Sequence, residues 1–306
     1  MRFTHVTALL LGLLLASPAD AEPLADALKA IDDQDYAKAS ELLRKAFEAG
    51  DGDAAFYMGR MVELGLGGQP DMNAAVAAYV AGTAKGSAVA KNRLGLLHLE
   101  GQGVLQDFER GAELICGAAA QGEVNALFNC GVIHDEGRGR PKDRQQALEY
   151  YRKAADLGHV GARNLLAAAL ADGKDVAADP RKAFELWQQT AAQGNPVGLF
   201  KLAEAYRKGL GVAADPVRAH AYFNLAAARQ HPEAAIGRAE VEKALTPEQV
   251  TEAQRIARAW RPTEAASPAG ALAKAPAIAK PPQPVAPKAA PAAAAPAQKP
   301  TTPPKP

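Results

Sequence analysis

The sequence has few of the residues that build β-sheets and reactive centres. Of its 306 residues only 6% are aromatic, and it contains two cysteines and two tryptophans. Hydrophobic residues make up 48% of the chain and are rich in alanine and leucine, whereas β-branched and aromatic types are sparse. This composition favours packed helices over β-sheet.

The chain also lacks a long apolar run and an excess of one charge. Beyond the N-terminal leader no stretch of about 18 apolar residues occurs, so the sequence predicts no transmembrane anchor. The formal net charge is +1. A nucleic-acid-binding protein would show a basic face or strip, and none is evident, so we expect no nucleic-acid partner.

Residues 1–21 have the pattern of a secretory signal peptide. Arg2 gives a short basic start, an apolar run follows from Val6 to Ala16, and Ala19-Asp20-Ala21 offers small residues for cleavage. No cysteine lies near the cleavage point, which argues against a lipoprotein anchor. We therefore expect a mature protein that begins at about Glu22 and is periplasmic or secreted.

Glycine and aspartate both recur in the sequence at a fixed step of 36 residues. The glycines are Gly65, Gly101, Gly137, Gly173 and Gly209, and the aspartates are Asp71, Asp107, Asp143, Asp179 and Asp215. A fixed period of this size is typical of a solenoid, in which each unit buries its apolar face against its neighbours. Five complete units occupy residues 54–233 without an insertion.

Each unit predicts two helices. The first ends at the repeated glycine, which can adopt the left-handed conformation that terminates a helix. The repeated aspartate then caps the second helix, and Asp179-Pro180 and Asp215-Pro216 place proline at its first position. The second helices end at Gly86, Gly122, Gly158 and Gly194, whereas the fifth unit has Gln230 at this position.

This pattern resembles the Sel1-like repeat family, which is related to the tetratricopeptide class. Clear examples are the segments Ala154-Ala155-Asp156-Leu157-Gly158 and Asp215-Pro216-Val217-Arg218-Ala219. The resemblance covers roughly residues 35–231 and implies an all-α, right-handed α/α superhelical solenoid of 36-residue helix-turn-helix repeats. Asp175 departs from the motif because the second loop glycine is missing there, so we expect a different local loop shape.

Both ends of the repeat region are predicted to be caps. Residues 22–53 hold two N-terminal capping helices, and residues 234–262 hold C-terminal capping helices, with a capping box at Thr246-Pro247-Glu248-Gln249. The segment 263–306 is rich in proline, alanine and lysine and has almost no large apolar residue. We expect it to be a disordered tail.

The two cysteines are candidates for a disulfide. Cys-rich relatives place a bridge between positions that correspond here to Ala119 and Leu127. Facing residues of an antiparallel hairpin have residue numbers with a constant sum, and Cys116 and Cys130 have the same sum as that pair. They lie one turn deeper in the same hairpin. The resemblance therefore implies a Cys116–Cys130 disulfide, which an oxidising compartment would permit. The alternative is two buried free thiols.

His98 and His134 occupy equivalent positions in consecutive units, with Glu100, Asp135 and Glu136 nearby. Equivalent helices pack about 10 Å apart, which is long for two imidazoles that share a zinc ion. We expect these histidines to belong to the core or to a groove, and we expect no metal and no cofactor.

No motif indicates an enzyme or a nucleotide site. The Gly-x-Gly loops, such as Gly101-Gln102-Gly103, follow helices, whereas a dinucleotide-binding loop follows a strand. Some Cys-rich relatives have been linked to penicillin binding or β-lactam hydrolysis, but the serines Ser40 and Ser87 are not followed by lysine three residues later. A β-lactam-acting enzyme is therefore only a remote alternative.

Equivalent positions on the first helices of the five units, here called the ring and amide column, suggest a binding groove. In tetratricopeptide relatives the first helices line the concave face, and an alternation of rings and amides there suits an extended peptide. Arg60, Glu204 and Arg207 lie close to this column in the sequence. The column reads Phe56, Asn92, Phe128, Asn164 and Phe200. The alternative is that the column packs between units.

We therefore expect an exported adaptor that binds a protein or peptide partner. The resemblance implies regulatory roles, including periplasmic control of signalling. The alternative is a structural protein of the cell envelope that contacts peptidoglycan or polysaccharide machinery through the stack and the tail.

Overall fold

The computed structural model describes residues 22–263, so the predicted signal peptide and the tail from residue 264 onward lie outside the described residues. This part of the chain contains fourteen helices and no strand. The helices are α1 (Glu22–Asp32), α2 (Tyr36–Glu48), α3 (Gly52–Leu64), α4 (Met72–Ala84), α5 (Ala88–Glu100), α6 (Phe108–Ala119), α7 (Val124–Glu136), α8 (Arg144–Asp156), α9 (Val160–Asp172), α10 (Pro180–Ala192), α11 (Pro196–Lys208), α12 (Pro216–Ala228), α13 (Ala234–Glu242) and α14 (Pro247–Ala259).

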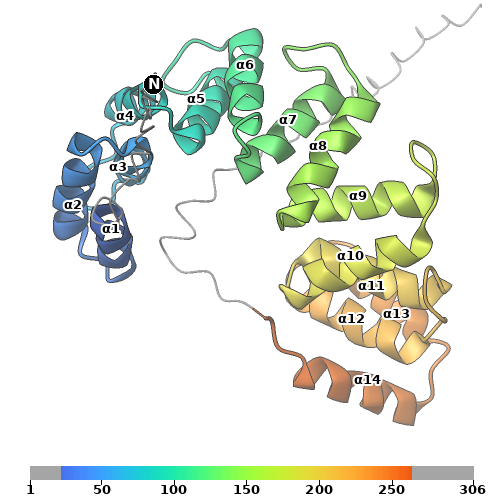
Figure 1. Ribbon diagram of the computed structural model, residues 1–306. Coiled ribbons are helices and arrows are strands. Elements are labelled where there is room, and N and C mark those ends of the chain that lie inside the picture. Colours follow the sequence, from blue (N-terminus) through green and yellow to red (C-terminus); the bar gives the residue numbers. More distant parts are fainter. Residues whose placement is uncertain (1–21, 264–306) are drawn as a thin grey trace, which may run out of the picture.

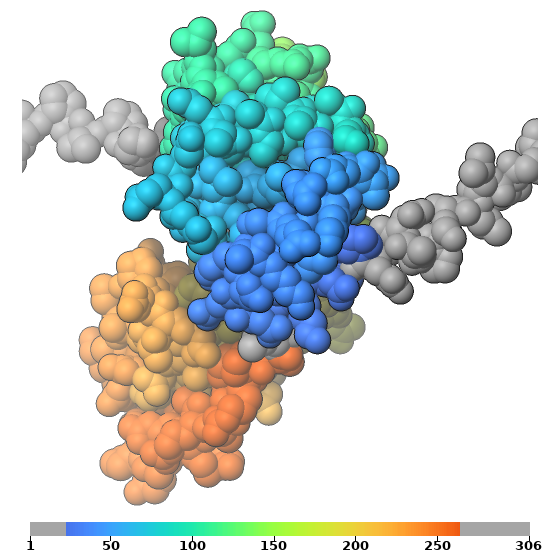
Figure 2. Space-filling view, turned by 90° about the vertical axis from the view of Figure 1, so that its left-hand side faces the viewer, coloured from blue at the N-terminus to red at the C-terminus, as the bar shows by residue number. Residues whose placement is uncertain are grey.

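The helices form a stack in which each packs mainly against its neighbours in the sequence. Helices α3 to α12 make up five hairpins, one for each predicted unit. The stack bends into an open arc from α1 through α6 and α9 to α14 (Figure 1). In Figure 2 the N-terminal helices and the C-terminal helices face the reader, and the middle of the chain lies behind them. The predicted all-α solenoid of helix-turn-helix repeats is confirmed.

The predicted helix ends are also confirmed. They could be predicted from the sequence because they depend on local backbone chemistry. All five repeated glycines that follow the first helices have φ between 68° and 75°, in the left-handed region. Each repeated aspartate accepts a hydrogen bond from the backbone N–H three residues later, as Asp107 does from Arg110 at 2.9 Å. The position of Gln230 adopts φ +62°, so this residue takes the turn that glycine makes in the earlier units.

The second loop glycine brings one unit close to the preceding one. A Cβ atom on Gly139 would lie 1.9 Å from the carbonyl oxygen of Phe108, at the start of α6, and φ there is +72°. The equivalent residue in the next unit is Asp175. It is not among the residues with positive φ, and its carboxylate binds Arg144 of α8 at 2.9 Å. An ion pair therefore holds this loop, whereas close contact of a glycine with the preceding unit holds the others: with backbone at Gly139 and Gly211, and mainly with side chains at Gly67 and Gly103.

Small residues on the first helices let the second helices approach closely. A Cβ atom on Gly59 would lie 2.5 Å from the ring of Tyr79, and one on Gly131 would lie 2.6 Å from the ring of Tyr151. Both tyrosines are buried. In the first three hairpins a large side chain of the second helix therefore lies over a glycine (Gly59, Gly95 or Gly131), and Ala167 and Ala203 take this position in the fourth and fifth.

Helices α1 and α2 precede the five hairpins, and α13 and α14 follow them. Thr246 and Gln249 exchange side-chain and backbone hydrogen bonds in a capping box at the start of α14. Helix α14 packs against α12. After it the chain returns to α10, where the backbone N–H of Thr263 donates to the carbonyl oxygen of Ala192 at 2.9 Å.

Candidate partner-binding surface

The structure contradicts the predicted groove along the ring and amide column. Phe56 and Asn92 are fully buried, and Phe128 and Phe200 are 9% and 8% exposed. These side chains point into the seams between helices, so a partner cannot reach them. The prediction that this column lines a binding groove is wrong, and its residues pack between units.

The phenylalanines of the column pair with rings of the second helices. The ring centroids are 6.1 Å apart for Phe56 and Tyr79, 5.8 Å for Phe128 and Tyr151, and 5.5 Å for Phe200 and Phe223. Successive pairs differ by 72 in residue number, which is two units. Every second unit therefore has an aromatic centre, with edge or tilted contacts that stabilise buried rings.

The asparagines of the intervening units make contacts inside the stack. The Oδ1 of Asn92 accepts from the Nδ2 of Asn129 in the next unit at 3.2 Å. The half-buried Asn164 accepts from the hydroxyl of Thr190 at 2.9 Å and donates to Asn195 at 3.0 Å. Asn195 in turn caps α11. These amides connect neighbouring helices instead of binding a peptide backbone.

Arg60, a further residue of the predicted groove, belongs to a buried ionic cluster. Its guanidinium lies 2.9 Å from the carboxylate of Glu63, which also binds Arg93 and accepts a hydrogen bond from the hydroxyl of Tyr79 at 2.5 Å. Burial raises the pKa of Glu63, but the bonds from Arg93 and Tyr79 outweigh it and hold the pKa below its usual value. The Glu63 carboxylate is therefore paired within the cluster and offers no base to a substrate, whereas the Nε of Arg60 and the Nη1 of Arg93 are buried without a hydrogen-bond partner.

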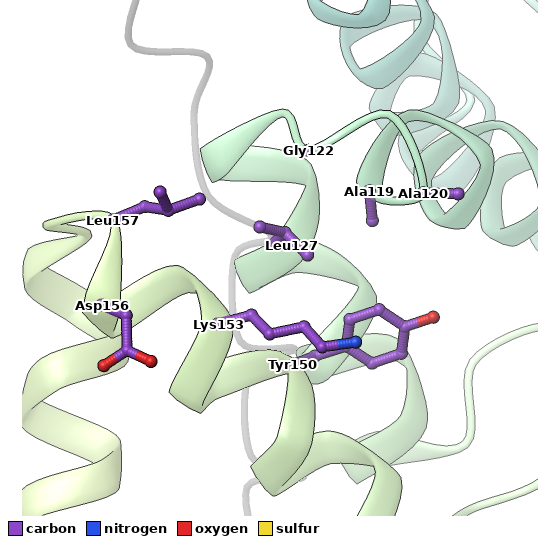
Figure 3. Close-up of a pocket in the computed structure, with 8 residues that line it drawn as sticks. All are labelled: Ala119, Ala120, Gly122, Leu127, Tyr150, Lys153, Asp156 and Leu157. Atoms are coloured by element: carbon purple, nitrogen blue, oxygen red, sulfur yellow. The ribbon is translucent and has the colours of Figure 1, made fainter.

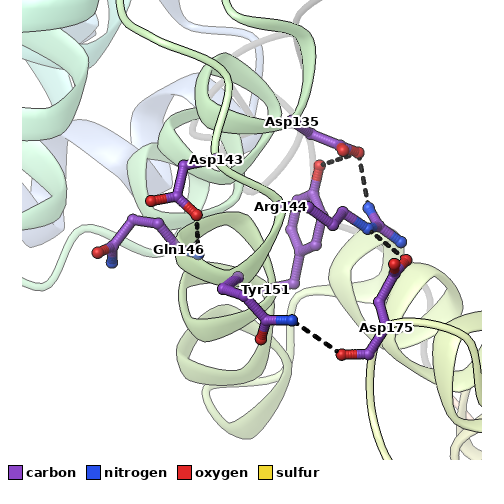
Figure 4. A network of polar contacts seen from close by, with 7 residues as sticks. Asp135, Asp143, Arg144, Gln146, Tyr151 and Asp175 are labelled. Atoms are coloured by element: carbon purple, nitrogen blue, oxygen red, sulfur yellow. Dashed lines mark hydrogen bonds and ion pairs between the residues drawn. The ribbon is translucent and has the colours of Figure 1, made fainter.

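A looser version of this cluster occurs two units later (Figure 4). The hydroxyl of Tyr151 lies 3.4 Å from Asp135, and Arg144 joins Asp135 at 2.8 Å to Asp175 at 2.9 Å. These contacts connect α7, α8 and the loop after α9. Because the carboxylates are paired with arginine, the arrangement stabilises the loop and has no feature of an acid–base catalytic pair.

The first helices leave an accessible hollow between α9 and α11. Helix α3 packs directly on α5 and α5 on α7, and this contact between first helices is less extensive at α9. The resulting hollow has a volume of about 300 Å³. Its lining combines apolar and charged side chains: Ala168, Ala171, Asp172, Trp187, Lys201, Glu204, Lys208 and Leu210. Leu165, one turn before Ala168, is 39% exposed.

The charges of this hollow are arranged at its edge. Glu204 binds both Lys208 and Arg207 at 2.7 Å. Of the residues of the predicted groove, Arg207 is the one that is exposed, and this ion pair connects it to the lining of the hollow. Trp187 is 3% exposed, and its indole N–H is buried without a hydrogen-bond partner. The hollow therefore has apolar lining residues and charges of both signs.

Sequence reasoning missed this hollow, although the sequence contains a signal for it. The column one turn further along the first helices reads Arg60, Leu96, Val132, Ala168 and Glu204. The first three are buried, whereas Ala168 is exposed. The change from bulky side chains to alanine in the fourth unit marks the place where the first helices no longer fill the space between them.

A second hollow lies on the side of the second helices, between the α6–α7 turn and α8 (Figure 3). Its volume is about 590 Å³. Leu127 and Tyr150 face it from α7 and α8, and Lys153 extends over the Tyr150 ring at 5.7 Å. Leu157 at the end of α8 is 58% exposed beside it.

The structure brings Cys116 and Cys130 together in a disulfide. The sulfur atoms are 2.03 Å apart and the Cα atoms 5.1 Å apart, and the bridge joins α6 of the second unit to α7 of the third. A ring nitrogen of His134 lies within 4.8 Å of both sulfurs. His98 is elsewhere, at 3.3 Å from the carbonyl oxygen of Leu105.

None of the helices in residues 22–263 combines the length and the apolar character that a bilayer crossing needs. The chain matches no curated protein. Among solved structures it is similar to a protective antigen of uropathogenic Escherichia coli strains that displays an SLR fold, with 28% identity, a TM-score of 0.69, and coverage of 79% of this chain and 53% of that one. This chain therefore spans about half the length of that relative.

A Sel1 repeat protein from Oxalobacter formigenes shares the fold, with 23% identity, a TM-score of 0.64, and coverage of 77% of this chain and 96% of that one. The Sel1 repeat itself matches six segments: 32–51, 52–77, 88–123, 124–159, 160–195 and 196–231. The first segment covers α2, which the sequence indicates as half a unit. From its sequence and its stack of hairpins, the chain belongs to the Sel1 repeat family.

Proposed function

We propose that this protein is an exported adaptor that binds a protein or peptide partner in the hollow between α9 and α11. Sel1 repeats generally form protein-interaction scaffolds. The hollow supports this use because it lies between first helices, where the stack leaves side chains accessible. Residues 1–21 support export, since their pattern is that of a signal peptide.

The observation that carries the proposal is the composition of the hollow. Ala168 and Ala171 are small lining residues that leave room for a partner side chain, Trp187 belongs to the lining although it is only 3% exposed, and Lys201 and Lys208 also line the hollow. Interface centres are typically apolar pockets that accept one anchoring side chain, with charged residues at the rim. A peptide with an apolar anchor flanked by charged residues of both signs would complement this surface, because Asp172 and Glu204 line it together with Lys201 and Lys208.

A photo-crosslinking residue at position 168, introduced into the full chain in intact cells, tests this proposal. We expect one partner to be captured from position 168 and not from position 188, because Gln188 is exposed on α10 and does not line the hollow. Mass spectrometry identifies the captured protein. Equal capture from both positions would contradict the proposal.

Binding of the captured partner should depend on the hollow. We expect Ala168→Arg to weaken binding at least about tenfold, because the long side chain fills the space beside Trp187. Gln188→Arg adds the same charge outside the hollow and should leave the affinity unchanged. Unaltered affinity of the Ala168→Arg variant, with an unaltered circular-dichroism spectrum, would exclude this surface.

A further inference from the structure

Two sulfur atoms and an imidazole meet at the junction of the second and third units. The Sγ atoms of Cys116 and Cys130 and a ring nitrogen of His134 all lie within 4.8 Å of one another. Cys130 and His134 are four residues apart on α7 and therefore share a helix face. Two thiolates and an imidazole form a donor set that suits a thiophilic cation such as Zn²⁺.

His134 also has a buried ring nitrogen that lacks a partner. Its Nδ1 is buried and makes no hydrogen bond. A buried ring nitrogen without a partner is destabilising, and a metal ion would supply one. The ring of Tyr150 stacks on His134 with a centroid distance of 5.6 Å and an interplanar angle of 14°. This stacking fixes the plane of the imidazole, as supporting residues do around metal ligands.

Residues close to these three side chains line the larger hollow. Tyr150 lines it, as do Ala119 and Leu127, which lie three residues from Cys116 and Cys130 respectively. Both cysteines are themselves buried, at 8% and 0% exposed. The lining of the hollow of about 590 Å³ therefore includes residues within about one helical turn of each cysteine.

We propose that the dithiol form of this protein binds one Zn²⁺ ion through Cys116, Cys130 and His134, and that the disulfide and the metal exclude each other. Reduction by a dithiol transfers two electrons and two protons to the Cys116–Cys130 bond and oxidises the dithiol to its own disulfide. The two thiol protons leave when Zn²⁺ binds. A water molecule takes the fourth coordination position.

The geometry and the charge both allow this exchange. In a tetrahedral zinc site with Zn–S bonds of about 2.3 Å, the two sulfurs are separated by about 3.8 Å. The cysteine Cα atoms are 5.1 Å apart, so side-chain rotation can open this gap without separating α6 from α7. Two thiolates also neutralise the dication, which avoids a net charge in the buried seam.

Cobalt titration under anaerobic conditions tests the proposal, with Co²⁺ as a spectroscopic probe and Zn²⁺ as its competitor. The full mature chain reduced with a phosphine should show thiolate-to-cobalt absorption that saturates at one equivalent and disappears on addition of Zn²⁺. The oxidised chain should show none. We expect His134→Gln to weaken Co²⁺ binding at least about tenfold.

The matched control is His98→Gln, because His98 is the equivalent histidine of the preceding unit and has Leu94 at the position where His134 has Cys130. It should bind Co²⁺ like the parent protein. The His134→Gln variant keeps both cysteines, so its oxidised form serves as a folding control by circular dichroism. Equal binding by oxidised and reduced protein, binding that His134→Gln does not change, or no binding by the reduced chain would overturn the proposal.

Discussion

At the scale of single residues, His159 has two roles, and the first of them requires a neutral ring. Its Nδ1 accepts a hydrogen bond from the backbone N–H of Ala162 at 3.1 Å and so caps α9. Its ring also stacks on Phe128, with centroids 4.3 Å apart. Burial lowers the pKa of His159 to about 4. Protonation would remove the cap acceptor and place a charge in the seam.

We predict that stability falls with acidity because of this histidine. Its folded pKa lies below the unfolded value of about 6.5, so its contribution is complete above pH 6.5 and is lost as the pH falls toward 4. Between pH 7 and pH 5 the loss should reach about 2 kcal/mol. Urea unfolding at the two pH values measures it.

The control is His159→Asn, because asparagine caps α11 at the equivalent position 195 and does not titrate. The stability difference between the variant and the parent should change between pH 7 and pH 5. A constant difference would show that His159 does not protonate on unfolding.

Tyr79 and Tyr151 are a matched pair for measuring the two ionic clusters. The Tyr79 hydroxyl donates to the buried Glu63 at 2.5 Å, whereas that of Tyr151 is 3.4 Å from the more exposed Asp135. We predict that Tyr79→Phe costs about 2 kcal/mol and Tyr151→Phe less than about 1 kcal/mol. Thermal unfolding of both variants measures the two losses of stability, and equal losses would contradict the prediction.

At the scale of helices and loops, the sequence predicts the ends of the elements well. A glycine at φ near +70° and an aspartate cap act within a few residues, so their repetition is sufficient to place Gly101 and Asp107. The direction of the ring and amide column could not be read in this way. Whether Phe128 faces a groove or a seam depends on how closely the next unit packs, which no local pattern encodes.

The loop glycines give a prediction at this scale. Gly139 and Gly122 both have positive φ, at +72° and +86°, but a Cβ atom meets the Phe108 carbonyl oxygen at Gly139 and nothing within 4 Å at Gly122. We expect Gly122→Ala to cost about 1 kcal/mol for backbone strain. Gly139→Ala should cost several times more, because the loop must move away from α6.

Thermal unfolding of the two variants tests this difference. Gly122→Ala is the control for the left-handed backbone, since it adds the same methyl group where space is open. Comparable losses of stability would show that the loop after α7 moves away from α6 at little energetic cost. Its contact with α6 would then not fix the spacing of the units.

At the scale of the whole molecule, the stack is held by contacts between neighbours, with one covalent link at the junction of α6 and α7. We predict that the double variant Cys116→Ala, Cys130→Ala loses about 3 kcal/mol, since the bridge closes a short loop. For a protein of this size, this corresponds to a fall in Tm of roughly 6 to 12 °C.

Reduction of the parent protein without added metal is the control, and it should give a similar fall in Tm. The double variant itself should not respond to a reductant. If it unfolds at the same temperature as the oxidised parent, the bridge contributes nothing to the stability of the stack.

The spacing of the aromatic centres has a consequence for protein engineering. Ring pairs at residues 56 and 79, 128 and 151, and 200 and 223 recur every 72 positions. Excision of residues 88–159 would keep the alternation of units that have an aromatic ring pair with units that have asparagine at the equivalent position, called here aromatic and amide modules. It would also remove both cysteines together. Excision of residues 88–123 would fuse two aromatic modules and orphan Cys130. This molecule should therefore be shortened or extended in double modules.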